Sequence, residues 1–345
     1  MKRIVTLLGG HLFGLLLMAA VALSACVSEK QQEVQRVSDV EYSTVTDSIY
    51  CMMPGRLLAR HGYVYWQDAR GVDGIVHVVD AASGKETGSF GTIGEGPDDF
   101  TMPLPSVSPD GFYLDDLQKG ISHLYTVGKE GIQVEKGKMA ADGEVTQLVH
   151  VDRQTTVALT PGKDHPFQVT VYGRTEPGGQ FPVAEKYSNS FYLHQGNIAF
   201  NSDHKLLVYS SLTFPYLATY SLKKGRLSLQ RELSEEVSYT VQDGQLVMDK
   251  GSRRGAMELG LTKHHIVTLD RDVVTEGERP QGASPRDPST LPRSLFVHDY
   301  ELHLTHILTL PFPVLRICGD VESDQVYAIV LNPEYSLIKV DVSSL

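Results

Sequence analysis

The hydrophobic positions of the chain beyond residue 40 cluster in short runs and show almost no sustained helical spacing. Residues 63–66 and 75–80 are such runs, rich in Val, Tyr and Ile, and Gly, Asp, Asn and Pro separate the runs from one another. Short apolar runs bounded by turn residues are typical of β-strands. The pattern therefore predicts a protein built almost entirely of strands and turns.

These strand-like runs come in pairs that recur along the chain. One position in the first run of each pair serves as a marker: Val64, Tyr113, Val157, Leu207, Val267 and Tyr327. Successive markers are 49, 44, 50, 60 and 60 residues apart. A period of roughly 40–50 residues with about four strands per repeat is typical of β-propeller blades, which stack because no blade buries both faces alone. The sequence thus predicts an all-β, six-bladed β-propeller.

The last repeat offers three strand-like runs, near residues 314–317, 326–330 and 337–342. A fourth strand is available at the other end of the chain, within residues 40–46, where Tyr42, Thr44 and Thr46 alternate with other residues. Pairing this segment with the last blade removes an exposed sheet edge. We therefore expect a propeller closed by an N-terminal strand.

The first 26 residues have the pattern of a secretory signal. Lys2 and Arg3 give a basic start, residues 4–23 carry no charge, and small residues precede Cys26. A transmembrane helix is the alternative, because the apolar run is nearly long enough to span a bilayer. The signal is favoured, because Gly and His interrupt the run at 9–11 and no charged stop-transfer cluster follows.

The stretch Leu23-Ser24-Ala25-Cys26 resembles the lipobox of bacterial lipoproteins. The resemblance implies cleavage before Cys26 and acylation of its thiol, by palmitate or a similar chain, and of its new amine. Several acyl chains give durable membrane anchoring where one does not. The expected organisation is a lipoprotein signal peptide over 1–25, a lipidated tether over 26–39 and the propeller over 40–345.

Charge and composition narrow the classes of partner. The 345 residues include 31 basic and 42 acidic side chains, a net charge of −11. An acidic surface repels phosphate backbones, so nucleic-acid binding is not expected. A hydrophobic content of 41% is ordinary for a globular protein and excludes wholesale disorder.

One loop between the first two repeats carries a more specific pattern, with Gly94, Gly96, Pro97 and Phe100. It resembles the G-x-G-P-x-E-F turn of TolB-like, or NHL-like, six-bladed β-propeller lipoproteins of Bacteroidales-type envelopes. It departs from that turn at Asp99, where Glu is usual. We expect a structural turn in which the glycines permit positive φ, the proline fixes the backbone and the phenylalanine can plug the space between blades.

The resemblance implies a lipoprotein of the cell envelope, held in the outer membrane, and it leaves open whether the domain faces the periplasm or the exterior. The resemblance does not indicate a particular reaction or ligand. We expect no cofactor and assign no catalytic residue, because no nucleophile motif occurs. A divalent metal assembled from several blades at the channel mouth, as in propeller lactonases and lyases, is the alternative, and its ligands stay unknown.

Several polar residues have both a functional and a structural interpretation. The paired His264-His265, and His303 with His306, would each point to opposite faces of a strand, so neither pair simply shares a metal. The acidic residues at 115–116 and 270–272 follow strands, where Asp more often caps a turn than lines a site.

Two further features leave alternatives open. The irregular stretch 275–292 interrupts the fifth repeat, on the same propeller face as the loop containing Gly94. It is a binding surface or a tolerated insertion. Cys51 and Cys318 pair in an oxidising compartment or stay free thiols.

The leading functional hypothesis is a non-enzymatic binding or scaffolding propeller, anchored to the membrane by its lipid, that recognises an envelope protein or polymer. The alternative is a metal-dependent hydrolase or lyase, similar to lactonases. The fold does not decide between them, because propellers support both classes.

Overall fold

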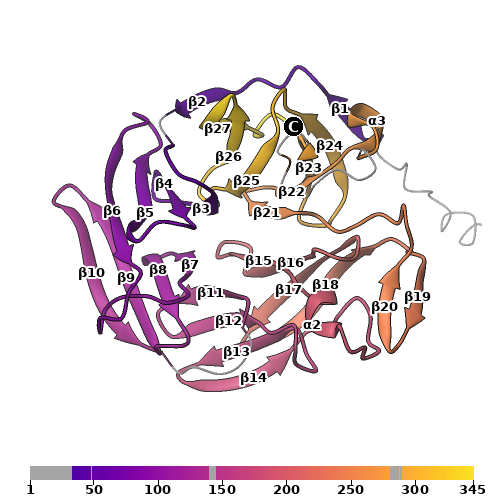
Figure 1. The fold of residues 1–345 in the computed structure, drawn as a ribbon, viewed down its shortest axis with the longest axis horizontal. Helices are drawn as coiled ribbons and strands as arrows, with labels where there is room; N and C mark the ends of the chain where they lie inside the picture. Colours follow the sequence, from indigo (N-terminus) through magenta and orange to yellow (C-terminus); the bar gives the residue numbers. More distant parts are fainter. Residues whose placement is uncertain (1–32, 48, 140–144, 280–286, 288–289) are drawn as a thin grey trace, which may run out of the picture. The chain divides into compact units, whose positions relative to one another are not determined.

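A computed structural model describes residues 33–47, 49–139, 145–279, 287 and 290–345. The expected signal peptide and Cys26 lie outside these residues. The described chain forms six sheets placed around a common axis and a separate two-stranded hairpin (Figure 1). This is the predicted all-β, six-bladed propeller.

Each blade is an antiparallel sheet whose strands follow one another from the axis outward. Blades 1 to 3 contain β3 (Pro54–Arg60), β4 (Tyr63–Asp68), β5 (Asp73–Asp80) and β6 (Glu86–Thr92); β7 (Leu104–Ser108), β8 (Gly111–Asp116), β9 (Ile121–Gly128) and β10 (Gly131–Lys138); and β11 (Gln147–Asp152), β12 (Thr155–Leu159), β13 (Phe167–Val171) and β14 (Arg174–Gly178).

Blades 4 to 6 follow the same plan, with N-terminal additions to the last two. They contain β15 (Gly196–Asn201), β16 (Leu206–Ser211), β17 (Tyr216–Lys223) and β18 (Arg226–Ser234); β21 (Glu258–Leu261), β22 (Ile266–Asp270), β23 (Ser294–His298) and β24 (Leu304–Thr309); and β25 (Val314–Gly319), β26 (Gln325–Asn332) and β27 (Glu334–Asp341). All six sequence markers fall in the second strand of their blade, so the predicted period is confirmed.

The ring is closed by β2 (Ser43–Thr46), which pairs antiparallel with β27. Thr44 lies opposite Ile338, and a bulge separates it from Thr46. Three strands of blade 6 thus come from the end of the chain and the outer strand from its beginning, as predicted.

A second N-terminal strand was not predicted. β1 (Gln35–Val37) pairs parallel with β24 as a fifth, outermost strand of blade 5. Val37 lies opposite Leu308 and packs on the apolar cluster between blades 5 and 6. The expectation that the tether runs to residue 39 is therefore wrong from Gln35 onward, because this short segment finds a free sheet edge.

Apolar side chains from facing sheets hold neighbouring blades together. Between blades 5 and 6, for example, Val267 and Leu295 meet Val326 and Ala328, and all four are fully buried. Five such clusters occupy five of the six interfaces. Burial of apolar surface at about 25 cal/mol per Å² makes these interfaces the main source of stability.

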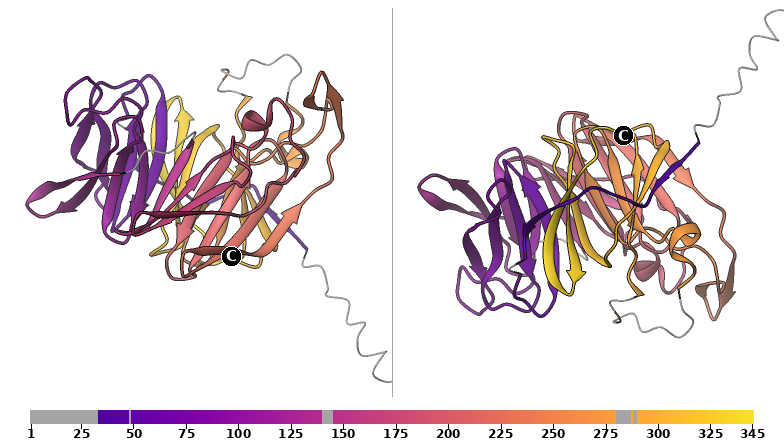
Figure 2. Two further views of the ribbon diagram at one scale, coloured as in Figure 1. Left: turned by 90° about the horizontal axis from the view of Figure 1, so that it is seen from below. Right: turned by 90° about the horizontal axis from the view of Figure 1, so that it is seen from above.

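The longer connections gather on one side of the ring, called here the loop-rich face (Figure 2). They include residues 93–103; 179–195 with α2 (Ser190–Leu193); 235–257 with the hairpin β19 (Tyr239–Gln242) and β20 (Gln245–Met248); and 271–293 with α3 (Val273–Glu276). The stretch 275–292 joins the second and third strands of blade 5, as predicted. The first strand of every blade begins at this face and runs along the axis.

Candidate binding site in the central channel

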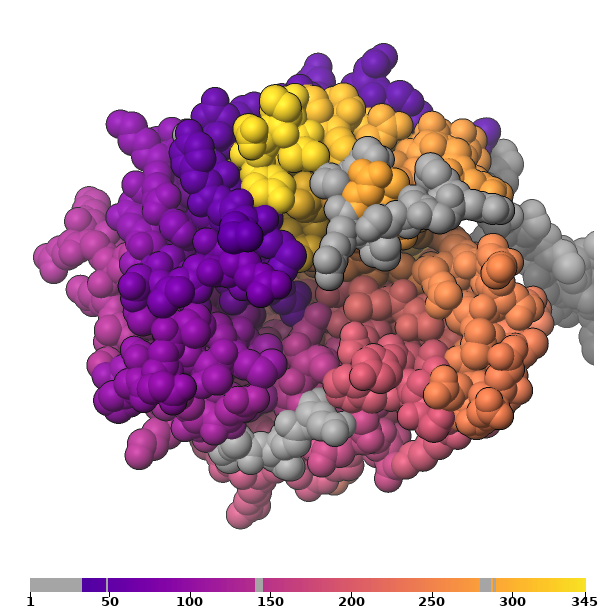
Figure 3. Space-filling view, in the orientation of Figure 1, coloured from indigo at the N-terminus to yellow at the C-terminus, as the bar shows by residue number. Residues whose placement is uncertain are grey.

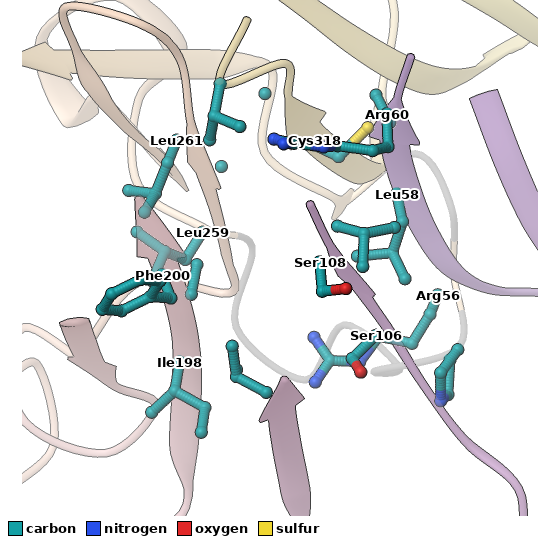
Figure 4. Close-up of a pocket in the computed structure, with 18 of the residues that line it drawn as sticks. Arg56, Leu58, Arg60, Ser106, Ser108, Ile198, Phe200, Leu259, Leu261 and Cys318 are labelled. Atoms are coloured by element: carbon teal, nitrogen blue, oxygen red, sulfur yellow. The ribbon is translucent and has the colours of Figure 1, made fainter. Parts of the chain in front are cut away.

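The first strands of all six blades surround a narrow cavity of about 80 Å³ at the axis. Figure 3 shows a hollow at the centre of the molecule, and Figure 4 shows side chains entering the cavity from several blades. A site here has one contribution from each repeat, so its residues are far apart in the sequence.

Arg56 is the main charged group in this channel. Leu57 and Ala59 point from β3 toward blade 6, whereas Arg56, Leu58 and Arg60 alternate with them and line the cavity (Figure 4). Among the described residues, the Arg56 guanidinium has no hydrogen-bond or ion-pair partner. Burial lowers its pKa; Glu258 opposes this shift and Arg316 adds to it. A desolvated charge without a partner is costly, which favours binding of a counter-ion.

Glu258 is shared between two guanidinium groups. Arg316 Nη1 donates to Glu258 Oε1 at 3.1 Å, and Arg316 Nε donates to the carbonyl oxygen of Gly55 at 2.8 Å. These bonds connect blades 5, 6 and 1 at the start of their first strands. Burial raises the pKa of Glu258, while Arg316 and Arg56 oppose the shift. One carboxylate cannot neutralise both arginines, so this end of the channel carries a net positive charge.

Two more unsatisfied donors line the same cavity. The hydroxyl of Ser106 is buried, and no described residue forms a hydrogen bond with it. Arg60 is 8% exposed; its Nη2 lies 3.7 Å from Glu322 Oε1, and its Nε has no partner among the described residues. Buried polar groups are nearly always paired in native structures. Their presence here indicates a ligand or ordered water.

Guanidinium groups with a nearby hydroxyl suit carboxylate or phosphate oxygens, which accept charge-assisted hydrogen bonds. The same positive charge disfavours a divalent cation. Within the described part of the chain, no group of three or more His, Cys, Asp or Glu residues could hold a metal ion.

The predicted turn lies between β6 and β7, on the loop-rich face. Asp99 Oδ2 accepts a hydrogen bond from the backbone N–H of Gly96 at 2.8 Å. Phe100 is 1% exposed and packs in the apolar cluster between blades 1 and 2. Pro97 follows Gly96 at the tip of the turn. These residues lie away from the channel cavity.

Gly94 and Gly96 do not use the positive φ that glycine permits. Gly91 nearby adopts it, with φ of 81°. A Cβ on Gly94 would lie 2.5 Å from Asp99 Oδ2, and one on Gly96 would lie 2.6 Å from it. The two glycines make room for the Asp99 carboxylate, at the position where the resembling turn has Glu.

Other candidates from the sequence have structural roles. Asp116 is fully buried and accepts hydrogen bonds from the backbone N–H groups of Thr101, Met102, Gln118 and Lys119. It therefore caps turns, in agreement with the structural interpretation. His264 Nδ1 lies 2.6 Å from Asp324 Oδ2 and is not part of a metal cluster.

Cys51 and Cys318 are both free thiols. Cys318 is buried, and Cys51 packs against the same apolar cluster between blades 6 and 1. Burial raises the pKa of both thiols, that of Cys51 to about 11. Neither is therefore a ready nucleophile, because the thiolate is the reactive form.

No sequence pattern predicted the residues of the channel site: Arg56, Ser106, Glu258 and Arg316. Each comes from a different blade, so no local spacing connects them. The available signal was a charged residue near the start of a first strand in three of the repeats, where apolar residues predominate.

No family model matches the chain, and no curated protein matches its sequence. Among solved structures, a Bacteroides fragilis NCTC 9343 protein named as an exported protein is similar over 89% of this chain and 98% of its own, with a TM-score of 0.53 and 8% identity. The β-propeller domain of Cps50 (Swd1) from Myceliophteria thermophila is similar over 87% and 99%, with a TM-score of 0.47 and 9% identity. The first likeness supports the propeller fold. None of the helices in the described residues is long and apolar enough to cross a membrane.

Proposed function

We propose that this protein is a lipid-anchored envelope protein whose propeller is a non-enzymatic binding module. Its channel, opening on the loop-rich face, receives an anionic group, a carboxylate or phosphate, of an envelope protein or polymer. The observation that carries this proposal is the half-buried guanidinium of Arg56 in the channel, which has no partner among the described residues.

The anchor and location rest on the sequence and on one comparison. The basic start, the apolar segment and the lipobox-like Leu23–Cys26 support export and acylation at Cys26. The turn at Gly94–Phe100 supports kinship with TolB-like or NHL-like lipoproteins. A similar fold occurs in a protein named as exported.

The metal-dependent hydrolase or lyase is the less favoured function. Such an enzyme needs acidic and imidazole ligands converging at the axis. Here Arg56, Arg60 and Glu258 line the cavity at the axis, and the Glu258 carboxylate is already paired with Arg316. Electrostatic repulsion by these groups opposes binding of a divalent cation.

The test is calorimetric titration of the propeller with sodium succinate and with inorganic phosphate. We expect one of them to bind to the wild type and not to Arg56→Met, which keeps side-chain length and removes the charge. Arg231→Met is the matched control, because Arg231 lies on β18 at the outer edge of blade 4 and pairs with Glu301.

The two anions separate carboxylate from phosphate recognition. Pull-downs from envelope extracts, with and without protease digestion, then separate a protein partner from a polymer. If wild type and Arg56→Met bound both anions equally, the channel would not be the binding site. If the wild type bound neither anion, the proposal would be overturned.

A further inference from the structure

The interface between blades 2 and 3 differs from the other five. No apolar cluster of the described residues spans it. A cavity of about 450 Å³ lies there instead, between the facing sheets. Interfaces of proteins are normally packed without voids, so a cavity of this size needs an occupant.

The wall formed by blade 3 is polar because of strict alternation along its strands. Val149, Val157 and Val169 face blade 4 and are buried in its cluster. The next residues along the strands form a row across the whole sheet on the other face: His150, Thr156, Thr170 and Thr175, paired from β11 to β14. All four line the cavity. Gln168 stands in the adjacent row and adds an amide.

The inner end of the cavity is built around Asp115, which is fully buried. His150 Nε2 donates to Asp115 Oδ2 at 3.0 Å, and Ser122 Oγ donates to Asp115 Oδ1. The His150 ring stacks on Tyr113, with centroids 3.6 Å apart. The second ring nitrogen of His150, Nδ1, is buried and has no partner among the described residues, so it can bond a ligand.

The outer end of the cavity is marked by a strained tyrosine. Tyr172 has φ of 49°, and Gly173 after it has φ of 75°, in the turn between β13 and β14. Turns with two positive φ values favour Asn-Gly, and a bulky residue there is uncommon. Tyr172 nevertheless occupies the position, is 75% exposed and lines the cavity. His61 and Lys224 occupy similar turns before a glycine, so it is the exposure of the Tyr172 ring at the cavity that makes it available to a ligand.

Arg153 at the rim of the cavity is paired with two carboxylates, and Lys138 adds a second basic side chain to the lining. Arg153 Nη1 donates to Glu135 Oε2 at 2.9 Å, and Arg153 Nε lies 3.4 Å from Asp110 Oδ1. Both ion pairs join blade 3 to blade 2 at exposed positions, where such pairs contribute little and exchange readily. The cavity presents hydroxyl, amide and aromatic groups beside apolar side chains such as Leu117, Leu124 and Leu148.

We propose that this cleft binds a short saccharide segment. Neutral hydroxyls and amides hydrogen-bond sugar hydroxyls, and an exposed aromatic ring covers the apolar face of a pyranose. A volume of roughly 300–1,000 Å³ is usual for small-molecule sites, and this cleft falls within it. An apolar ligand would leave the polar groups of Thr156 and Gln168 unpaired, whereas the hydroxyls of Thr170 and Thr175 bond each other at 2.9 Å. An anion would find Arg153 already paired. Leu148 and His150 line both this cleft and the channel, whereas Arg56 lines only the channel.

The test is a thermal-shift and calorimetric screen of the propeller against mono-, di- and trisaccharides of glucose, galactose, mannose, xylose and N-acetylglucosamine. We expect at least one to bind. Tyr172→Asn should weaken that binding at least tenfold while leaving the melting temperature equal or higher, because Asn suits the positive φ. Thr170→Val, which removes one hydroxyl and keeps the shape, should also weaken it.

Two controls keep the result specific. Tyr239→Asn removes an exposed tyrosine on the distant β19 and should not change binding. Arg56→Met should not change saccharide binding either. Failure of the channel proposal and failure of the saccharide proposal can therefore be told apart. No binding by any saccharide at 10 mM, or binding indifferent to both cleft variants, would overturn the inference.

Discussion

The ammonium group of Lys119 donates a hydrogen bond to the carbonyl oxygen of Gly94 at 2.8 Å, from blade 2 back to the connection that leaves blade 1. The same Nζ also bonds the carbonyl oxygens of Gly96 at 3.0 Å and Asp99 at 2.9 Å. One side chain thus donates hydrogen bonds to three carbonyl groups of a turn that has no regular secondary structure.

Replacing Lys119 by Met should therefore destabilise the propeller. Three half-buried acceptors lose a charged donor, and we expect a loss of about 1–3 kcal/mol in the free energy of unfolding. Urea denaturation measures it. Lys129→Met, at an exposed position of the β9–β10 hairpin, is the control and should change stability by less than about 0.5 kcal/mol. Equal effects of the two changes would contradict this role.

The glycines of the same turn should behave as partners of Asp99. Gly94→Ala introduces a Cβ only 2.5 Å from Asp99 Oδ2 and should cost about 1–3 kcal/mol. In the background of Asp99→Ala the same change should cost much less, because the obstructing carboxylate is gone. A double-mutant cycle measures this coupling. Additive effects would show that Gly94 is needed for another reason.

Stability should fall in acid partly through His298. Burial lowers the pKa of this 5% exposed histidine to about 4, while its backbone contact with Leu302 and the charge of Asp299 oppose the shift. The unfolded chain takes up a proton near pH 6.5, before the folded one does. The free energy of unfolding should therefore decrease between pH 6.5 and 4, by about 3 kcal/mol for this group alone.

His298→Gln tests this assignment, because it removes the titrating group. Its denaturation curves should be less pH-dependent than those of the wild type across the same window. A slope identical to that of the wild type would assign the acid sensitivity to other groups.

The closing strand should be essential for stability. Deleting residues 38–48 exposes the edge of β27 and removes the contacts of Val45 with the apolar cluster between blades 6 and 1. We expect the melting temperature to fall by at least 10 °C. Replacing residues 43–46 by Gly-Ser-Gly-Ser, which preserves chain length, should have a similar effect. Unchanged melting of both variants would show that blade 6 is stable with three strands.

Anchoring is tested by Cys26→Ala in the full chain. The wild type should incorporate labelled palmitate and partition into the membrane fraction, and the variant should do neither. The isolated residues 27–345 are a second control, because they lack both the signal and the acylated residue. Palmitate label retained by the variant would move the modification away from Cys26.

The repeat rhythm made the fold predictable, because each blade's second strand is an apolar run between turns. The third repeat was the weakest in the sequence, and the structure supplies the reason. Thr156, Gln168 and Thr170 replace apolar residues on the face toward blade 2. The period-two alternation of polar and apolar residues in β13 was visible in the sequence. It does not show which neighbouring blade the polar face lies against.

Other features could not be predicted for physical reasons. Closure of the ring is what brings together Arg56, Glu258 and Arg316. The sequence pattern of a single strand does not say how close it lies to a strand of another blade. Gly94 was placed in the right turn for the wrong reason, since positive φ and close approach both select glycine. β1 is only three residues long, and nothing in its sequence indicates that it pairs with β24 at the edge of blade 5.

The pairing of Thr44 with Ile338 also sets an order of events for a chain made from its N-terminus. β2 is synthesised before any blade, yet its partner β27 appears after all the others. The ring therefore cannot close until the whole chain has been made and, in an exported protein, has crossed the membrane. Contacts between such distant segments form slowly. Until then the open edges of blades 1 and 6 are the surfaces that need protection from aggregation.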